Sequence, residues 1–177
     1  MHSPRRSFVC LALGAFALTA TASATPATLA DDVRVLERIQ ELRRETWRWQ
    51  RLMRVPLIRT TYHAERATPE FRRWALALWR KRAGAARGAA HNPPRRPAWL
   101  CIHRHEGPWN ARTGNGYYGG LQMDIAFQRR WGPDLLRAKG LAHRWLPIEQ
   151  IWVAERAYRS GLRFRPWPNT SRACGLV

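Results

Sequence analysis

The strongest candidate for chemistry in this 177-residue sequence is Glu106, at the end of a helix predicted over Ala98–Glu106. Trp99, Ile102 and Glu106 are spaced at i, i+3 and i+7, which places the carboxyl group on the apolar face of that helix. Burial raises the pKa of a carboxyl group, and a carboxyl that stays protonated can act as a general acid toward a glycosidic oxygen. A glutamate that pairs with one of the many arginines is the alternative, and the spacing alone does not separate the two interpretations.

The residues that follow Glu106 carry aromatic and amide side chains on either side of Gly119 and Gly120. Aromatic rings stack on sugar faces, amides hydrogen-bond hydroxyl and acetamido groups, and glycine lets the backbone approach a ligand closely. Each of these side chains also has a structural alternative in the core, in a turn or in a strand, so their joint presence carries the prediction. The candidate substrate-binding residues are Trp109, Asn115, Tyr117, Tyr118 and Gln122.

Other titratable residues near Glu106 have simpler explanations. Glycosidases with two carboxylates use the second one as nucleophile or base, and Asp124 is the nearest candidate in sequence. Asp124 also precedes a predicted helix, and capping of that helix is the favoured explanation. His103 and His105 are two residues apart and do not share a helix face, so we expect no metal, and we expect no cofactor.

Helices are expected to position these residues. The Asn115-Gly116 pair predicts a hairpin turn, with Tyr117–Met123 as the returning strand. The expected fold class is α+β and helix-dominated, with a small β-hairpin, a helical segment before it and an irregular, proline-rich tail after it. The other helices predicted after Glu106 cover residues 125–131, 134–139 and 147–161.

The residues before Ala98 form a basic, amphipathic pattern. Asp31–Met53 has apolar or tolerant residues every three or four positions, and a second helix begins at Thr68-Pro69, with Thr68 as its N-cap. The two helices could form a hairpin. From Ala83 to Pro97 the sequence turns rich in glycine, alanine and proline, which predicts a linker. The expected divisions are a leader at 1–24, a helical region at 25–90, a proline-rich linker at 91–97 and a compact domain at 98–177.

The sequence is strongly basic, with 31 Lys and Arg against 12 Asp and Glu and a formal net charge of +19. Such a field favours polyanionic surroundings, such as nucleic acid, anionic lipid or an acidic wall polymer. Glutamates are interspersed among the arginines of the helical region and no nucleic-acid-binding motif is present, so nucleic acid is not an expected partner. A helical spacer or wall-docking element is favoured over membrane or nucleic-acid binding.

The first 24 residues have the features of an export signal. Arg5 and Arg6 precede an apolar run over Phe8–Ala20, and small residues that suit cleavage follow at 22–24. The adjacent arginines also resemble a twin-arginine signal, so the export route stays open. We therefore expect a secreted, extracellular protein.

Two cysteines, Cys101 and Cys174, remain after removal of the leader. An even number of cysteines in an oxidising compartment favours a disulfide over two separate buried thiols. On the chain-entropy description such a bridge would stabilise the fold by about 3–4 kcal/mol. It would also hold the tail against the segment that precedes Glu106.

Three motifs carry a likeness to a known family: HEGPWN from His105 followed by TGNGYYGGLQM, then AERAYRSG, and finally PWP. Together they resemble the catalytic domain of resuscitation-promoting factors and related lysozyme-like lytic transglycosylases of actinobacteria, over roughly the last 80 residues. The resemblance implies a lysozyme-like fold, Glu106 as catalytic acid and a disulfide near the site. That family typically carries Cys-Glu-Ser-Gly-Gly at the catalytic residue, whereas here His105 precedes Glu106, Pro108 replaces a glycine and the cysteine lies earlier.

The same resemblance implies cleavage of peptidoglycan at the β-1,4 bond between N-acetylmuramic acid and N-acetylglucosamine. With a single carboxylate, Glu106 would donate a proton to the leaving oxygen while the substrate's acetamido group supports the cationic centre. Hydrolysis and formation of a 1,6-anhydro product both remain open. Peptidoglycan strands and anionic wall polymers are the expected partners in a cell-wall-associated protein, and docking of a peptidoglycan endopeptidase is left open. The alternatives are a non-catalytic glycan-binding protein and a cationic membrane- or nucleic-acid-binding protein.

Overall fold

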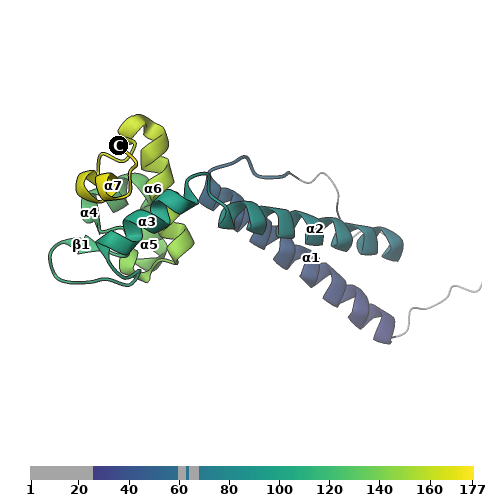
Figure 1. Ribbon diagram of the computed structural model, residues 1–177. Coiled ribbons are helices and arrows are strands. Elements are labelled where there is room, and N and C mark those ends of the chain that lie inside the picture. Colours follow the sequence, from purple (N-terminus) through teal and green to yellow (C-terminus); the bar gives the residue numbers. More distant parts are fainter. Residues whose placement is uncertain (1–25, 60–62, 64–67) are drawn as a thin grey trace, which may run out of the picture.

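Two long helices open the described part of the chain. The structure is a computed structural model that describes residues 26–59, 63 and 68–177, and the predicted leader lies outside the described residues. Helix α1 (Pro26–Met53) and helix α2 (Pro69–His91) pack along each other and project from the rest of the molecule (Figure 1). We refer to α1 and α2 as the helix pair and to residues 92–177 as the C-terminal lobe.

The helix pair is parallel, so the hairpin suggested by the sequence is wrong. Asp32 pairs with Arg72 near the N-terminal ends of α1 and α2, and Glu45 pairs with Arg87 farther along both helices. The end of α1 and the start of α2 therefore lie at opposite ends of the pair. A connection of about 15 residues can reach roughly 50 Å, which exceeds the length of α2, about 35 Å. Short antiparallel connections are commoner, which is why the sequence favoured a hairpin.

Helix α2 is longer than expected, because the predicted linker from Ala83 onward is helical as far as His91. Thr68 caps this helix as predicted, accepting a hydrogen bond from the backbone amide of Phe71. The alanines 83, 86 and 90 are all buried. Alanine has the highest helix propensity, and its small side chain lets a neighbouring helix approach closely. The connection to α3 (Arg96–Glu106) is thus only residues 92–95.

The C-terminal lobe is built around α6 (Pro147–Ala157), which has nine buried residues among its eleven. Strands β1 (Tyr117–Tyr118) and β2 (Met123–Asp124) form a small antiparallel sheet. The expected helix-dominated α+β class, with a small β-hairpin after a helical segment, is confirmed. The other elements of the lobe are α4 (Ile125–Trp131), α5 (Pro133–Lys139), η2 (Ala142–Arg144), η3 (Tyr158–Leu162) and α7 (Pro168–Ala173).

The β-hairpin is shorter than predicted. The Asn115-Gly116 pair does lie in a chain reversal, because Arg112 bridges Tyr118 across it, but β1 ends after two residues. The chain turns again at Gly119, which has a φ of 77°. A Cβ at this position would lie 2.4 Å from Oε1 of Gln150 on α6. The close packing of α6 against the turn ends the strand, and the sequence pattern of the strand does not reveal that contact.

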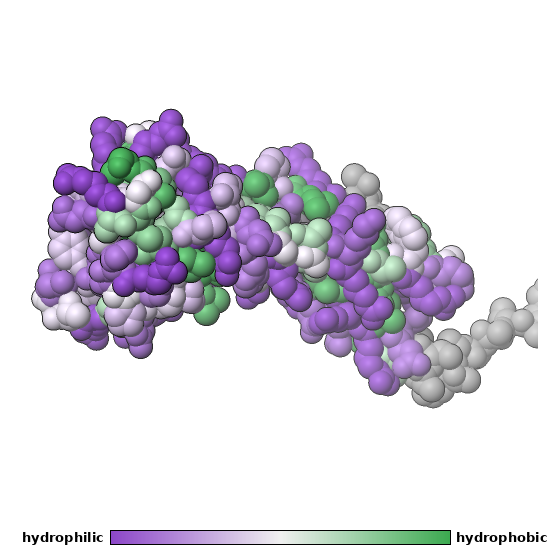
Figure 2. All heavy atoms as spheres, in the orientation of Figure 1, coloured by the Kyte–Doolittle hydropathy of each residue, from purple (hydrophilic) through white to green (hydrophobic). Residues whose placement is uncertain are grey.

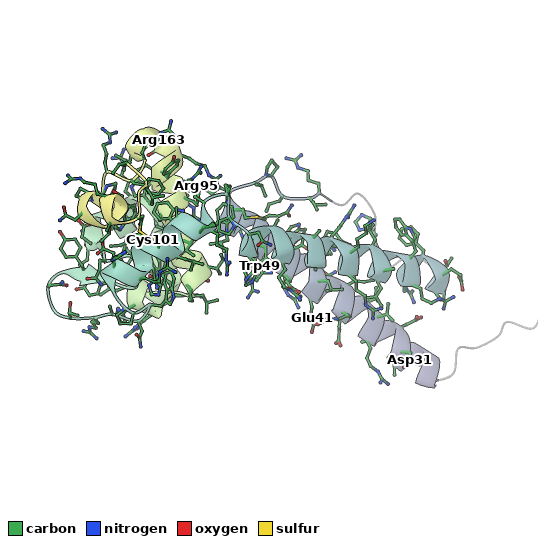
Figure 3. The ribbon with its side chains drawn as sticks, in the orientation of Figure 1. Asp31, Glu41, Trp49, Arg95, Cys101 and Arg163 are labelled. Atoms are coloured by element: carbon green, nitrogen blue, oxygen red, sulfur yellow. A yellow bond between two sulfur atoms is a disulfide. The ribbon has the colours of Figure 1, made fainter. Side chains whose placement is uncertain are left out.

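An apolar cluster fixes the helix pair to the C-terminal lobe. Trp49 and Leu52 of α1 pack with Ile148 and Trp152 of α6, and Figure 3 shows Trp49 where the pair meets the lobe. The indole N–H of Trp152 also donates to the carbonyl oxygen of Ala90 at 2.7 Å. The region expected as a proline-rich linker therefore borders a packed joint.

Arg156 of α6 reinforces this joint. Its guanidinium donates to the carbonyl oxygen of Leu52 at the end of α1 (2.7 Å) and to that of Trp131 at the end of α4 (2.8 Å). The last carbonyls of a helix lack partners within the helix, and a cation there is favourable. Burial, with a contribution from Arg54, lowers the pKa of Arg156 to about 10, so the group stays protonated at neutral pH.

The tail is more ordered than the irregular structure predicted for it. Pro168 occupies the first turn of α7, a position that suits proline because its missing N–H would have no partner there. Trp167 and Ser171 are buried, and Cys174 forms a disulfide with Cys101 of α3. The tail thus packs against α3.

Hydrophilic side chains cover much of the surface of both the helix pair and the lobe, with smaller hydrophobic patches between them (Figure 2). Within the described residues, no helix is long and apolar enough to span a membrane. The amphipathic pattern of α1 is used internally, since Ile39 and Leu42 are buried against Ala75 and Trp79 of α2.

Candidate active site

Helix α3 positions Glu106 at the boundary between the core and solvent. Trp99 and Ile102 are fully buried, as their spacing predicted, and Glu106 follows them on the same side as a half-buried residue. Gly107 ends the helix with a φ of 144°, a conformation that favours glycine. The carboxyl group is therefore less enclosed than the apolar face suggested, and it remains open to a ligand.

The tail contributes a partner to Glu106. The hydroxyl of Thr170 on α7 donates to Oε1 of Glu106 at 2.8 Å. The Cys101–Cys174 disulfide holds α7 against α3, with a Cα–Cα distance of 6.0 Å, and this is the pairing that the sequence favoured. The indole N–H of Trp167 also donates to the carbonyl oxygen of Leu121 at 2.7 Å. Thr170 is a site residue that sequence analysis missed, although the cysteine count had already indicated that the tail lies near α3.

Glu106 differs from the buried glutamates of α6 in its partners. Among the described residues, no arginine, lysine or histidine lies within ion-pairing distance of Glu106. By contrast, Glu155 pairs with Arg95 at 2.6 Å and Glu149 pairs with Lys139 at 2.7 Å. In the structure, Glu106 therefore does not form the ion pair with an arginine that was the alternative interpretation of its sequence position.

The β-hairpin contacts the same turn of α3 through His103. Nδ1 of His103 donates to the carbonyl oxygen of Gly120 at 3.2 Å, and its ring stacks on Trp109 with centroids 3.8 Å apart. A Cβ on Gly120 would lie 2.6 Å from both rings, so glycine is needed there. One face of Trp109 is thus already covered, which leaves less of the ring for sugar stacking than the sequence suggested.

A buried glutamine on α6 fixes the turn of the hairpin. The side-chain Oε1 of Gln150 accepts from the backbone N–H of Gly120 at 2.8 Å. Its Nε2 donates to the carbonyl oxygens of Trp109 (2.8 Å), Ala142 (3.0 Å) and Trp145 (3.2 Å). A satisfied buried amide gives no periodic signal in a sequence, so this residue was also missed.

The other predicted substrate-binding residues have mixed roles. Asn115 is exposed and accepts a hydrogen bond from the backbone N–H of Tyr117 (3.1 Å), while Gln122 donates to the carbonyl oxygen of Gly119 (2.8 Å). Both amides therefore shape their own turns. Tyr117 is 47% exposed and offers an accessible ring, whereas Tyr118 is half-buried beside the core.

Asp124 and His143 are two further titratable residues near the sheet. The carboxylate of Asp124 accepts from the backbone N–H of Phe127 at 2.6 Å, so the predicted N-cap of α4 is confirmed. The ring of His143 lies 5.9 Å from that of Tyr118. Burial and then the charges of Arg112 and Arg144 lower the pKa of His143, which favours its neutral form at pH 7.

The described residues bring three potential metal ligands together near the site. Ligand atoms of Cys101, His105 and Cys174 lie within 4.8 Å of one another. Metal binding by cysteine requires the thiolate, and both sulfurs are joined in the disulfide. With the disulfide intact, this group offers only His105 as an ordinary ligand.

Comparison with known proteins adds no family assignment. No protein-family model matches the chain, and no curated protein matches it. The segments at His105, over TGNGYYGGLQM and at PWP nevertheless converge in space. His105 and Glu106 end α3, the TGNGYYGGLQM segment forms the hairpin that His103 contacts, and Trp167 of PWP bonds to Leu121 in that hairpin. Figure 1 shows β1, α7 and the end of α3 together at the end of the lobe that faces away from the helix pair.

Proposed function

We propose that this chain cleaves peptidoglycan glycan strands, with Glu106 as a single acid and base. The observation that carries the proposal is the state of this carboxyl group. Glu106 is half-buried at a helix end, receives a hydrogen bond from Thr170 and has no cationic partner among the described residues. A carboxyl group that is not tied up in an ion pair can exchange a proton with a substrate.

The division of labour between the two carboxyl oxygens follows from that hydrogen bond. Thr170 donates to Oε1 of Glu106, so Oε2 is the oxygen that would act on a substrate. In the first step the protonated carboxyl would transfer its proton to the glycosidic oxygen, while the acetamido group of N-acetylmuramic acid supports the anomeric centre. In the second step the carboxylate would accept a proton from the sugar's 6-hydroxyl or from water. Tyr117, with its exposed ring, is the best placed of the predicted residues to stack on a sugar.

Product analysis tests this proposal most directly. Purified peptidoglycan would be incubated with the protein, and the soluble fragments would be identified by mass spectrometry. Anhydro ends would identify transglycosylase chemistry, and reducing ends would identify hydrolysis. If neither appears and the protein still sediments with the polymer, the protein is a glycan-binding module and the enzymatic proposal is wrong.

The charge of the protein fits a location in a cell wall. A net charge of +19 would concentrate an exported protein on anionic wall polymers. Helix α1 has 28 residues and is therefore about 42 Å long, so the helix pair can hold the lobe away from an attachment point. We propose the helix pair as a spacer or wall-docking element and the wall polymers as its partners.

Thr170 is proposed as a positioning residue for Glu106. Thr170→Val keeps the side-chain shape but removes the donor, and it should lower kcat roughly 10-fold, as expected for one hydrogen bond to a charged group. KM and the thermal midpoint should change little, because the hydroxyl touches Glu106 and not the substrate. Thr170→Ser restores the donor and should restore kcat. A normal kcat in Thr170→Val, or a failure of Thr170→Ser to recover activity, would show that the hydroxyl does not position the acid.

A further inference from the structure

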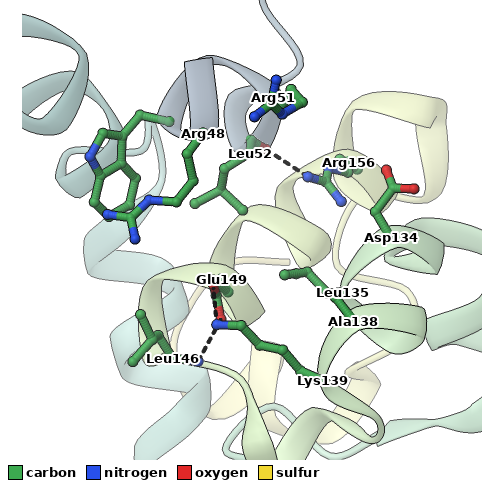
Figure 4. Close-up of a pocket in the computed structure, with 11 residues that line it drawn as sticks. Arg48, Arg51, Leu52, Asp134, Leu135, Ala138, Lys139, Leu146, Glu149 and Arg156 are labelled. Carbon is green, nitrogen blue, oxygen red and sulfur yellow. Dashed lines mark hydrogen bonds and ion pairs between the residues drawn. The ribbon is translucent and has the colours of Figure 1, made fainter. Parts of the chain in front are cut away.

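A cavity of about 360 Å³ lies at the joint between the helix pair and the C-terminal lobe (Figure 4). It is bordered by the last turns of α1, by α5 and by residues at both ends of α6. This volume is within the range of roughly 300–1,000 Å³ that small-molecule sites occupy. None of the described residues that line it belongs to α3, to the β-hairpin or to α7. The cavity is therefore separate from the candidate active site.

The interior of the cavity is apolar. Leu52 and Leu135 reach into it from α1 and α5 (Figure 4). Trp49 of α1 also lines it. Leu146 lies at its edge and is 50% exposed. Ala138 leaves open space on the α5 side, where a larger side chain would fill it. An apolar ligand would bury the exposed surface of Leu146.

Several of the polar groups that border the cavity have partners within the protein. Lys139 donates to both carboxylate oxygens of Glu149, at 2.7 and 2.8 Å, and Glu149 also accepts from the backbone N–H of Leu146. Arg156 is held by the two helix-end carbonyls described above. These contacts hold the walls in place, so binding would order few groups there.

The rim of the cavity is cationic. Four lining side chains are basic and two are acidic. Lys139 and Glu149 neutralise each other, and Asp134 pairs with Arg137 at 2.9 Å. The basic groups left at the mouth are the exposed Arg48 and Arg51, and the guanidinium of Arg48 lies 4.5 Å from the ring centroid of Trp49.

We propose that this cavity binds a small amphipathic anion. The apolar body would lie between Leu52, Leu135 and Leu146, and its carboxylate would face Arg48 and Arg51. An inorganic anion would gain nothing from the apolar walls, and a neutral hydrocarbon would gain nothing from the guanidiniums of the rim. The proposal does not depend on the activity of Glu106.

Decanoate is the probe for this site, used well below the concentration at which it forms micelles. Calorimetric titration of the full chain should give saturable binding of one decanoate, with amide NMR shifts at residues 48–52 and 134–139. Ala138→Trp fills the cavity and should weaken binding at least ~10-fold, because a well-packed pocket does not tolerate added volume. Arg51→Gln should weaken binding about 3- to 10-fold by removing a charge-assisted contact.

The matched control is Arg129→Gln, which removes the same charge from an exposed position on α4 outside the cavity. It should leave decanoate affinity unchanged, and neutral decanol should bind more weakly than decanoate. Leu146→Asp changes an exposed residue, so it should fold, and its negative charge at the mouth should abolish binding. The proposal is overturned if decanoate does not saturate a site, if Ala138→Trp and Leu146→Asp bind normally, or if Arg129→Gln loses as much affinity as Arg51→Gln. Equal binding of decanol would overturn the anionic part of the assignment.

Discussion

Replacing Glu106 with glutamine is expected to reduce muropeptide release by at least ~100-fold and up to ~10,000-fold, the range that general acid–base groups contribute. Glutamine keeps the shape of the side chain and can still accept a hydrogen bond from Thr170, but it can neither donate a carboxylic proton nor take one up. The measurement is the rate of soluble muropeptide release from purified peptidoglycan, followed by mass spectrometry. Sedimentation of Glu106→Gln with the same polymer should stay close to that of the unaltered protein.

Glu41→Gln is the matched control for this experiment. Glu41 is exposed on α1, and its pair with Arg38 is a surface contact of the kind that contributes little. Glu41→Gln removes the same charge as Glu106→Gln and should leave both muropeptide release and sedimentation with peptidoglycan unchanged. Activity that survives in Glu106→Gln would rule out the proposed acid, whereas loss of sedimentation in that variant alone would point to a binding role for the carboxylate.

Local chemical signals in the sequence predicted several structural features around Glu106. The helix predicted to end at Glu106 does end there, Asp124 marked the start of α4, and the pair of cysteines predicted the bridge from Cys101 to Cys174. Each of these signals acts within a few residues or through one specific covalent bond. Prediction from residue type and spacing is therefore effective where a single neighbour decides the conformation.

Features that depend on distant partners were not predicted. The contact between Thr170 and Glu106 joins residues 64 positions apart, and Gln150 reaches Gly120 across 30 positions. The predicted direction of α2 relative to α1 was wrong for the same reason. The residue pairs that define this direction, such as Glu45 with Arg87, lie 42 positions apart. The alanine- and glycine-rich end of α2 resembles a linker in the sequence, because the local sequence does not show the surface that buries its alanines.

The largest expected effect on stability comes from Glu155, which is fully buried in α6. Its carboxylate accepts from the backbone N–H of Arg95 (3.2 Å), the guanidinium of Arg95 (2.6 Å) and the indole N–H of Trp99 (2.8 Å). Glu155→Ala leaves these donors without their acceptor, and removing one member of a buried ion pair typically costs about 3–5 kcal/mol. Urea denaturation followed by circular dichroism should show a loss of this size in the free energy of unfolding.

Glu45→Ala is a close control, because Glu45 also accepts from an arginine, Arg87, and from an indole, that of Trp49. That site is more exposed, so its loss should cost no more than ~1 kcal/mol. Burial opposes ionisation of Glu45, but the hydrogen bonds from Arg87 and Trp49 and nearby charges outweigh it and lower its pKa below 4.5. Because the pKa of Glu45 is lowered in the folded state, its contribution to stability is present at neutral pH. The contribution is lost only as the pH falls below the pKa of an ordinary glutamate. Similar costs for Glu155→Ala and Glu45→Ala would mean that burial does not set the strength of the contact, and that α3 is oriented chiefly by its apolar face.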